Sequence, residues 1–427
     1  MLNRAAAPEF KTIEKIDIIK PSEKFLDNGV PLYTIHAGSQ ELTKVEFIFS
    51  AGMYFQNRTL LASTTNTLLE AGTTKRNALQ LSEHIDFFGS FLELEVGQDY
   101  SSITIYSLNK YLNESLAFVE EILKDSIFPL SEIEIHLANR KQKHLINSGK
   151  VSHLARRKFS ELLFGAQHPY GIDAKTEDFD TLKQADILNF YKNHYSSKNC
   201  FIVAAGNLPK DLHSVINTHF GKGNWGSASP IKSVEAKITS TRQQKHLVEK
   251  SDAIQSAIRI GRVLFNKTHE DYFKFQVLNT ILGGYFGSRL MANIREDKGY
   301  TYGIGSGLTS FVNSGFFYIS TEVGSDVTKN ALEEIYKEIA KLRNDLVSAE
   351  ELETVRNYIL GQFLRSVDGP FALAEKFVGI KEFGLDYNYY ENYFKAVKNV
   401  TANDLRDLAN KYLQEKDLIE CVAGPSA

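Results

Sequence analysis

One order of predicted elements occurs twice along the chain, and this repeat limits the possible folds more than any other feature. In each copy, alternating strands precede two short helices, a hairpin follows, and further helices and an apolar strand end the copy. The first copy covers residues 1–221 and the second 242–427, while residues 222–241 are rich in Gly, Ser and Pro and predict a linker. The sequence therefore predicts an α+β protein of two homologous mixed α/β halves.

The predicted elements of the two copies correspond in order. The first copy has predicted strands at 24–36, 42–50, 91–96, 101–107 and 200–205, and helices at 60–71, 79–88, 112–126, 132–163, 183–195 and 212–220. The second has strands at 253–263, 300–308, 315–323 and 418–423, and helices at 271–282, 288–296, 329–344, 350–367 and 401–413. A short strand is also predicted at 15–19, in a polar N-terminal arm.

The composition excludes several classes of protein. Hydrophobic residues make up 43% and charged residues 24% of the 427 residues, which is typical of a folded protein with domains of roughly 150 residues. Lys plus Arg is 49 and Asp plus Glu is 52, and this balance argues against a nucleic-acid-binding protein. No uninterrupted apolar run reaches about 18 residues, so no membrane span is expected.

Two features bear on the cellular compartment. Cys200 and Cys421 lie in apolar, strand-like surroundings without CxxC spacing, which predicts buried free thiols. The N-terminal residues lack the apolar core of a secretory signal. The expected location is the cytoplasm, or the periplasm if an export segment has been removed.

The candidate site residues lie in the second copy. The pattern there predicts a short helix over 288–296 and then a strand over 300–308, whose Tyr300 and Tyr302 would share one face. Such a corner would present Arg295 close to Tyr302. By local pattern alone, however, these residues are a solvated helix-end charge and a half-buried strand aromatic.

Four motifs have a diagnostic order and spacing. They are the segment Leu68–Leu94, HPYG at His168–Gly171, the segment Asn189–Asn207, and GGYFGSRLMANIREDKGYTYG at Gly283–Gly303. Together they resemble the pitrilysin/insulinase family of zinc metallopeptidases, in particular its members similar to mitochondrial processing peptidase. The resemblance covers nearly the whole chain, and it implies that the two halves form half of a clam-shell chamber.

The zinc ligands of that family are missing here. Its active members carry His-x-x-Glu-His on the first helix, where two imidazoles on one face bind zinc and the Glu polarises the bound water. When the chain is aligned on Gly72-Thr73, Ser63, Asn66 and Thr67 stand at the three positions. The resemblance therefore implies a vacated zinc site, with no catalytic residue, metal ligand or cofactor in this chain.

Other residues do not replace these ligands. A second register would keep a glutamate at Glu70, but it also lacks both His. The family's third ligand is a Glu from a later helix, and it would fall within Lys143–Ser148, where no carboxylate occurs. The histidines considered as replacement ligands are predicted to be solvated or structural, because none of them forms an i, i+4 pair: His84, His136, His144, His153 and the turn residue His168.

The family also places an Arg and, seven residues later, a Tyr opposite the zinc, where they hold the substrate backbone. Arg295 and Tyr302 match this spacing. The resemblance implies a non-catalytic subunit of a heterodimeric zinc endopeptidase, which binds the peptide while an HxxEH-bearing partner supplies the zinc. Two alternatives stay open: an inactive structural or peptide-binding protein, like the core subunits of a respiratory complex, and an independent metallopeptidase with unrecognised ligands.

Overall fold

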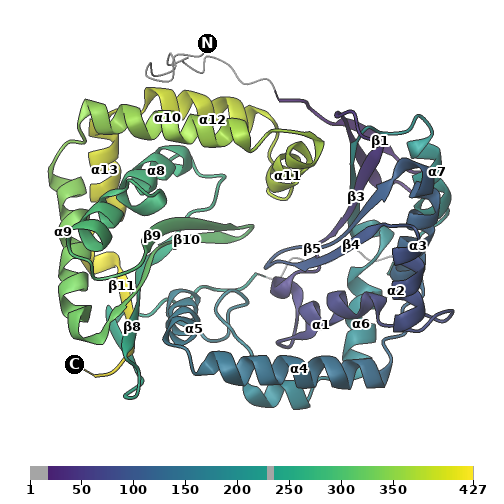
Figure 1. Ribbon diagram of the computed structural model, residues 1–427, viewed down its shortest axis with the longest axis horizontal. Coiled ribbons are helices and arrows are strands. Elements are labelled where there is room, and N and C mark those ends of the chain that lie inside the picture. Colours follow the sequence, from purple (N-terminus) through teal and green to yellow (C-terminus); the bar gives the residue numbers. More distant parts are fainter. Residues whose placement is uncertain (1–17, 228–234, 427) are drawn as a thin grey trace, which may run out of the picture.

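The computed structural model describes residues 18–227 and 235–426, which form two halves, each built on a mixed sheet (Figure 1). The first half contains β1 (Ser22–Phe25), β2 (Pro31–His36), β3 (Leu42–Phe49), β4 (Phe91–Val96), β5 (Ser101–Leu108) and β6 (Cys200–Gly206). Its α-helices are α1 (Leu61–Thr67), α2 (Ala78–Phe87), α3 (Leu112–Lys124), α4 (Leu130–Ser148), α5 (Val151–Phe164), α6 (Gln184–His194) and α7 (Leu212–Phe220).

The second half contains β7 (Lys245–Glu249), β8 (Gln255–Leu264), β9 (Ile304–Phe311), β10 (Ser314–Gly324) and β11 (Ile419–Gly424). Its α-helices are α8 (Tyr272–Asn279), α9 (Thr328–Asn344), α10 (Ala349–Arg365), α11 (Pro370–Lys381), α12 (Asn388–Asn399) and α13 (Ala402–Tyr412). Two further segments, Thr280–Gly284 and Met291–Asp297, are π-helical. Figure 1 shows the two sheets on opposite sides of the molecule, with α4 and α5 along one margin and α10, α11 and α12 along the other.

The two sheets have corresponding strand orders. The first is β1-β2-β6-β3-β5-β4 and the second is β7-β11-β8-β10-β9, so the orders agree once β1 is set aside. Each sheet has one parallel pair at the same place, β2 with β6 and β7 with β11, and the other pairs are antiparallel. The predicted α+β fold with an internal repeat is therefore confirmed.

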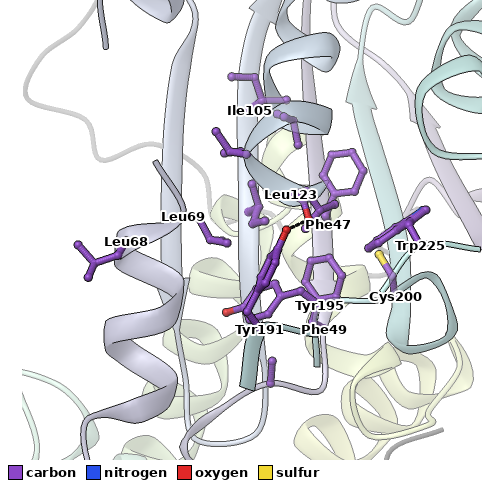
Figure 2. Close-up of a cluster of buried hydrophobic side chains, with 14 of the residues drawn as sticks. Phe47, Phe49, Leu68, Leu69, Ile105, Leu123, Tyr191, Tyr195, Cys200 and Trp225 are labelled. Carbon is purple, nitrogen blue, oxygen red and sulfur yellow. Dashed lines mark hydrogen bonds between the residues drawn. The ribbon is translucent and has the colours of Figure 1, made fainter. Parts of the chain in front are cut away.

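The core of the first half lies between its sheet and the helices that cover it. Phe47 and Phe49 point to one face of β3 and are fully buried, and Ile48 between them is buried on the other face. Their rings lie 4.6 Å from Phe220 and 5.0 Å from Tyr195, measured between ring centroids. Figure 2 shows this cluster with Trp225 beside it. Large aromatic contacts thus anchor the sheet against the segments that follow α6 and α7.

One helix of each half packs against the sheet of the other half. α5, from the first half, packs on β8 and β11, and α11, from the second half, packs on β2 and β6. Phe164 at the end of α5 lies 6.0 Å from Phe311 and 5.9 Å from Phe316 of the second sheet. In return, Phe377 of α11 lies 4.7 Å from Tyr33 of β2. This helix exchange buries apolar surface of each half under the other.

Polar contacts also tie the halves together where their hairpin turns meet. The Asp99 carboxylate, in the turn after β4, accepts a hydrogen bond from the Tyr170 hydroxyl at 2.5 Å. Its other oxygen accepts one from the N–H of Val312, in the turn after β9, at 2.9 Å. The Tyr100 hydroxyl donates to the Glu382 carbonyl, just after α11, at 2.9 Å. A cavity of about 340 Å³ remains at this junction, lined in part by Asp99 and Glu382.

The Glu382 carboxyl at this junction is expected to make stability depend on pH. Burial raises its pKa from 4.5 to about 7; Lys267 opposes the shift, and Glu46 and Asp99 add to it. The native state therefore keeps a proton that the unfolded chain has lost, so stability falls as pH rises from about 4.5 to about 7. The full shift would correspond to about 3 kcal/mol, which solvent screening of a half-buried group reduces to roughly 1–2 kcal/mol.

Glu382→Gln removes this titration. Urea unfolding should show the variant about 1–2 kcal/mol more stable than the unmodified chain at pH 8, with little difference at pH 4.5. The same change at the exposed Glu83 serves as a control and should leave the pH profile unaltered. A constant offset at both pH values would show that the carboxyl of Glu382 does not titrate between them.

Several predicted boundaries are wrong. The helix predicted at 132–163 is two helices, because Gly149 ends α4 and α5 starts at Val151. The strand predicted at 24–36 is β1 and β2 joined by a turn, with Gly29 at φ +85°. Helices α11 and α12 were not predicted, although α11 begins at Pro370, which favours the first turn of a helix.

The connection between the halves lies partly outside the described residues. Residues 228–234 of the predicted linker, and most of the strand predicted at 15–19, lie outside the described residues. The described segment 235–241 contains no helix or strand, and the N–H groups of Thr239 and Thr241 donate to carbonyls at the end of α5. In the ranges 18–227 and 235–426, no helix is both long and apolar enough to cross a bilayer.

Candidate substrate-binding site

Helix α1 carries the three residues at the family's zinc positions. Ser63 is half-buried and Thr67 is exposed, whereas Asn66 is fully buried. The Asn66 amide donates to the Glu95 carbonyl at 3.1 Å, and its oxygen accepts a hydrogen bond from the Tyr195 hydroxyl at 2.8 Å. Asn66 is therefore part of the hydrogen bonding of the core, and it fixes α1 to β4 and to the end of α6.

A guanidinium group occupies the space beside α1. Arg140 of α4 donates to the Ser63 hydroxyl at 2.7 Å and to the Thr64 hydroxyl at 3.3 Å. Burial lowers the pKa of Arg140, but an arginine remains a cation in proteins. The segment expected to hold the later ligand, Lys143–Ser148, is on the same helix, yet the contact with α1 comes from Arg140, one turn earlier.

The residues around α1 do not fit a zinc ion. Zinc binds thiolate, imidazole and carboxylate groups, and this site offers hydroxyl groups, an amide and a cation that would repel a second cation. The nearby helix α4 also carries His136, whose pKa is lowered to about 4 by burial and by Arg140 and Lys143. A single imidazole supplies only one of the several ligands that a zinc site needs. Throughout the described part of the chain, no three His, Cys, Asp or Glu side chains are grouped so that they could hold a metal.

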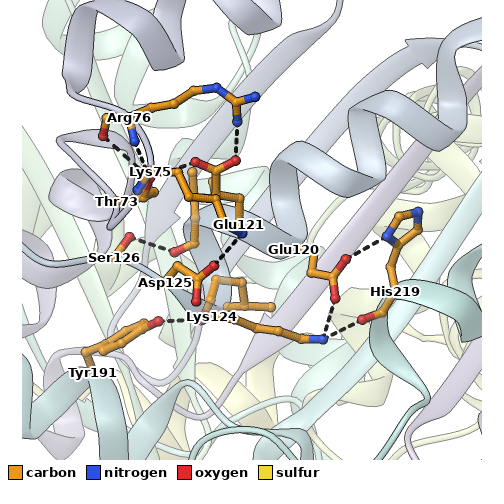
Figure 3. A network of polar contacts seen from close by, with 12 residues as sticks. Thr73, Lys75, Arg76, Glu120, Glu121, Lys124, Asp125, Ser126, Tyr191 and His219 are labelled. Carbon is orange, nitrogen blue, oxygen red and sulfur yellow. Dashed lines mark hydrogen bonds and ion pairs between the residues drawn. The ribbon is translucent and has the colours of Figure 1, made fainter.

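The Gly72-Thr73 pair that aligned the sequence has a structural role. The Thr73 hydroxyl donates to the Glu121 carboxylate of α3 at 2.7 Å, and the Arg76 guanidinium pairs with the other oxygen of the same carboxylate (Figure 3). A Cβ atom on Gly72 would lie 2.8 Å from the ring of Pro129, so the backbone passes too close for a side chain. This network fastens the segment after α1 onto α3.

Arg295 lies near the end of the π-helical segment Met291–Asp297, where an α-helix was predicted. Its side chain is 35% exposed, and its guanidinium carbon lies 4.8 Å from the centre of the Phe286 ring. A Glu296 carboxylate oxygen is 4.0 Å away. Arg295 is thus a surface cation that rests on an aromatic ring.

Tyr302 precedes β9 and is 96% exposed, so the prediction of a half-buried strand residue is wrong. β9 begins at Ile304, because the Thr301 hydroxyl takes the backbone groups that a strand would pair. It donates to the Glu322 carbonyl at 2.7 Å and accepts from the Gly303 N–H at 3.1 Å. Tyr300, in contrast, packs against the core of the second half. The two tyrosines therefore do not share an environment.

The predicted pair lies beside a sheet edge. Among the described strands, β9 pairs with β10 alone. The π-helical segment Thr280–Gly284 packs against β9, and the Asn279 side-chain amide donates to the Ser306 carbonyl at 3.4 Å. No hydrogen bond or ring contact joins Arg295 to Tyr302 within the described residues, and both side chains keep free donors. A guanidinium and a phenol can each donate to carbonyl oxygens of an extended peptide. This surface suits peptide binding but contains no group that activates water.

Comparisons with known proteins test the family resemblance. Residues 181–359 match the family described as the peptidase M16 inactive domain. The chain is thus similar to M16 peptidases. Over 422 residues it is 24% identical to an uncharacterized zinc protease of Rickettsia bellii, a match that covers 94% of this chain and 97% of that protein.

Solved structures show that the fold is that of M16 proteins. A structure from Pseudomonas fluorescens, described as a peptidase M16 inactive domain, superposes with a TM-score of 0.86 at 19% identity, and the match covers 95% of this chain and 98% of that one. A chain of complex III2 from Candida albicans superposes with a TM-score of 0.74 at 15% identity, covering 94% and 95%. At these identities the likeness concerns the fold alone.

The other residues considered from the sequence have packing roles. Cys200 and Cys421 are buried free thiols, as predicted, and burial raises the pKa of both. His168 accepts a hydrogen bond from the Tyr170 N–H at 3.1 Å, and so shapes the turn after α5. His84 lies against the Phe118 ring at 6.2 Å between ring centres.

Proposed function

We propose that this chain is the non-catalytic subunit of a heterodimeric M16 endopeptidase. Arg295 and Tyr302 bind the backbone of a peptide, and an HxxEH-bearing homologous subunit supplies the zinc and cleaves it. In this proposal each chain forms half of a closed chamber, and neither half contains the complete set of groups. The chemistry of hydrolysis belongs to the partner, while this chain holds and orients the peptide.

One observation carries the proposal: Tyr302 is 96% exposed just before β9 and the Arg295 guanidinium is partly exposed, while Ser63 and Asn66 at the zinc positions are hydrogen-bonded within the protein. A large exposed aromatic residue with a free hydroxyl adds nothing to folding. Its placement is explained if a ligand covers it. Asn66 and Arg140, by comparison, already have protein partners.

The second candidate function is that of an inactive structural or peptide-binding subunit. The fold likeness to a chain of complex III2 favours it, because it shows the same fold within a large assembly. In that case Arg295 and Tyr302 would bind a peptide without its cleavage, or would bind another subunit. The two candidates differ in whether activity appears on mixing with an HxxEH homologue.

Reconstitution tests the proposal. The chain and an HxxEH homologue from the same genome would be purified separately and mixed, and cleavage of a fluorogenic peptide library would be followed. Activity should appear only in the mixture, and elemental analysis should assign the zinc to the partner. A stoichiometric zinc ion bound to this chain alone would overturn the proposal. A stable complex without any gain in activity would support the structural function.

A further inference from the structure

Phe286 has a large exposed ring in the loop between the two π-helical segments. The preceding residue, Tyr285, anchors this loop, since its ring lies 4.9 Å from Tyr358 of α10. Gly287 follows, and a Cβ there would lie 2.8 Å from the Tyr285 ring, so the loop turns tightly over it. The backbone therefore directs Phe286 away from the core, and 64% of the residue is exposed.

The ring of Phe286 is the main support of the Arg295 side chain. The guanidinium carbon lies 4.8 Å from the ring centre, within the range of a cation–π interaction. A Glu296 carboxylate oxygen lies 4.0 Å from the Arg295 guanidinium, which is long for an ion pair. The Glu296 side chain is 51% exposed, so water competes for that contact. An arginine that rests on a ring keeps its planar donors pre-organised.

We infer that Phe286 is a positioning residue of the peptide site: it holds Arg295 toward the bound backbone, and its free surface receives an apolar side chain of the peptide. This inference rests on the proposed function and adds a substrate preference to it. The preferred peptide carries an apolar residue beside the carbonyl group that Arg295 binds. An aromatic wall next to a backbone donor is a common means of selecting such residues.

Kinetics in the reconstituted complex test both parts. Phe286→Ala should lower kcat/KM by roughly three- to tenfold, Phe286→Tyr should restore it, and Phe286→Leu should keep the preference for apolar peptides but not the rate. In the Arg295→Ala background, Phe286→Leu should cause no further loss of rate. Equal losses in both backgrounds would show that the ring does not act through Arg295. An unchanged ratio of rates for Leu- and Ser-containing peptides in Phe286→Ala would overturn the apolar subsite.

A measurement on the free chain separates this inference from the proposed function. The Arg295 Nε–H resonance should be shifted upfield by the ring current of Phe286, and Phe286→Leu should remove the shift. The same change at Phe87, which is 81% exposed on α2, should have no effect. If Phe286→Leu leaves the resonance in place, the positioning role is wrong even in an active complex. If the shift disappears but no partner yields activity, the proposed function and the substrate role of Phe286 are both wrong, and only the contact between Phe286 and Arg295 is confirmed.

Discussion

Arg295→Ala is expected to lower kcat/KM of the reconstituted complex by about 10- to 100-fold. A hydrogen bond from a charged donor contributes about 1.5–3 kcal/mol, and each 1.4 kcal/mol corresponds to a tenfold change in rate. Tyr302→Phe should have an effect in the same range if the hydroxyl helps to hold the developing oxyanion, as donors in such sites do. Because Tyr302 is 96% exposed, Tyr302→Phe should not alter the free energy of unfolding by more than about 0.5 kcal/mol.

Tyr300→Phe provides the matched control, because the same hydroxyl is removed two residues away, from a ring that packs on the core. It should leave kcat/KM within about twofold of the unmodified complex. Arg295→Lys keeps the charge but not the planar donors, and it should recover only part of the loss. If Tyr300→Phe and Tyr302→Phe have equal effects, the proposed role of the pair is wrong. If affinity for the partner falls instead of turnover, the pair belongs to the subunit interface.

Phe164→Ala and Phe377→Ala are each expected to reduce the stability of the whole chain by about 3–5 kcal/mol, the usual cost of truncating a buried Phe. Phe164 is 1% exposed and Phe377 is 6% exposed, and each contacts a sheet that belongs to the other half of the sequence. Because of this helix exchange, the loss should not be confined to one half. Urea unfolding followed by the Trp225 fluorescence and by circular dichroism should show both signals shifting together.

The control for this prediction is Phe87→Ala, since Phe87 is 81% exposed and its removal should change stability by less than about 0.5 kcal/mol. Two separate unfolding transitions, with Phe377→Ala moving only one of them, would show that the halves are energetically independent. Expression of residues 1–221 alone gives a second measurement. That fragment would lack α11, and the β2 and β6 surface that α11 covers would be exposed to solvent.

The order of elements could be predicted from the sequence because strands and helices differ in hydrophobic period, and both copies contain the same succession. The helix exchange could not be predicted in this way. The apolar face of α5 shows that the helix is buried on one side, but periodicity does not tell which sheet covers that side. Similarly, the strand predicted from Tyr300 failed because alternation continues through Thr301, whose hydroxyl diverts the backbone from pairing.

The candidate site was predictable only in part. The spacing of Arg295 and Tyr302 identified the pair through the family resemblance, but its exposure is visible only in the structure. Phe286 and Arg140 were not identified, because their roles depend on contacts with Arg295 and with Ser63 across the fold. For Phe286, the one available signal was the pair of aromatic residues between Gly284 and Gly287, where core residues would be unexpected.

The contact between Arg140 and Ser63 also bears on whether such a chain could regain peptidase activity in evolution. Ser63→His, Asn66→Glu and Thr67→His together would restore the motif, but its side chains would then lie beside the half-buried Arg140 cation. Asn66→Glu alone would also remove the amide that donates to the Glu95 carbonyl, so stability would fall before any ligand set was complete. Reversion thus depends on a prior change at Arg140, a residue outside the motif. Substitutions within the motif alone would not produce a working zinc site.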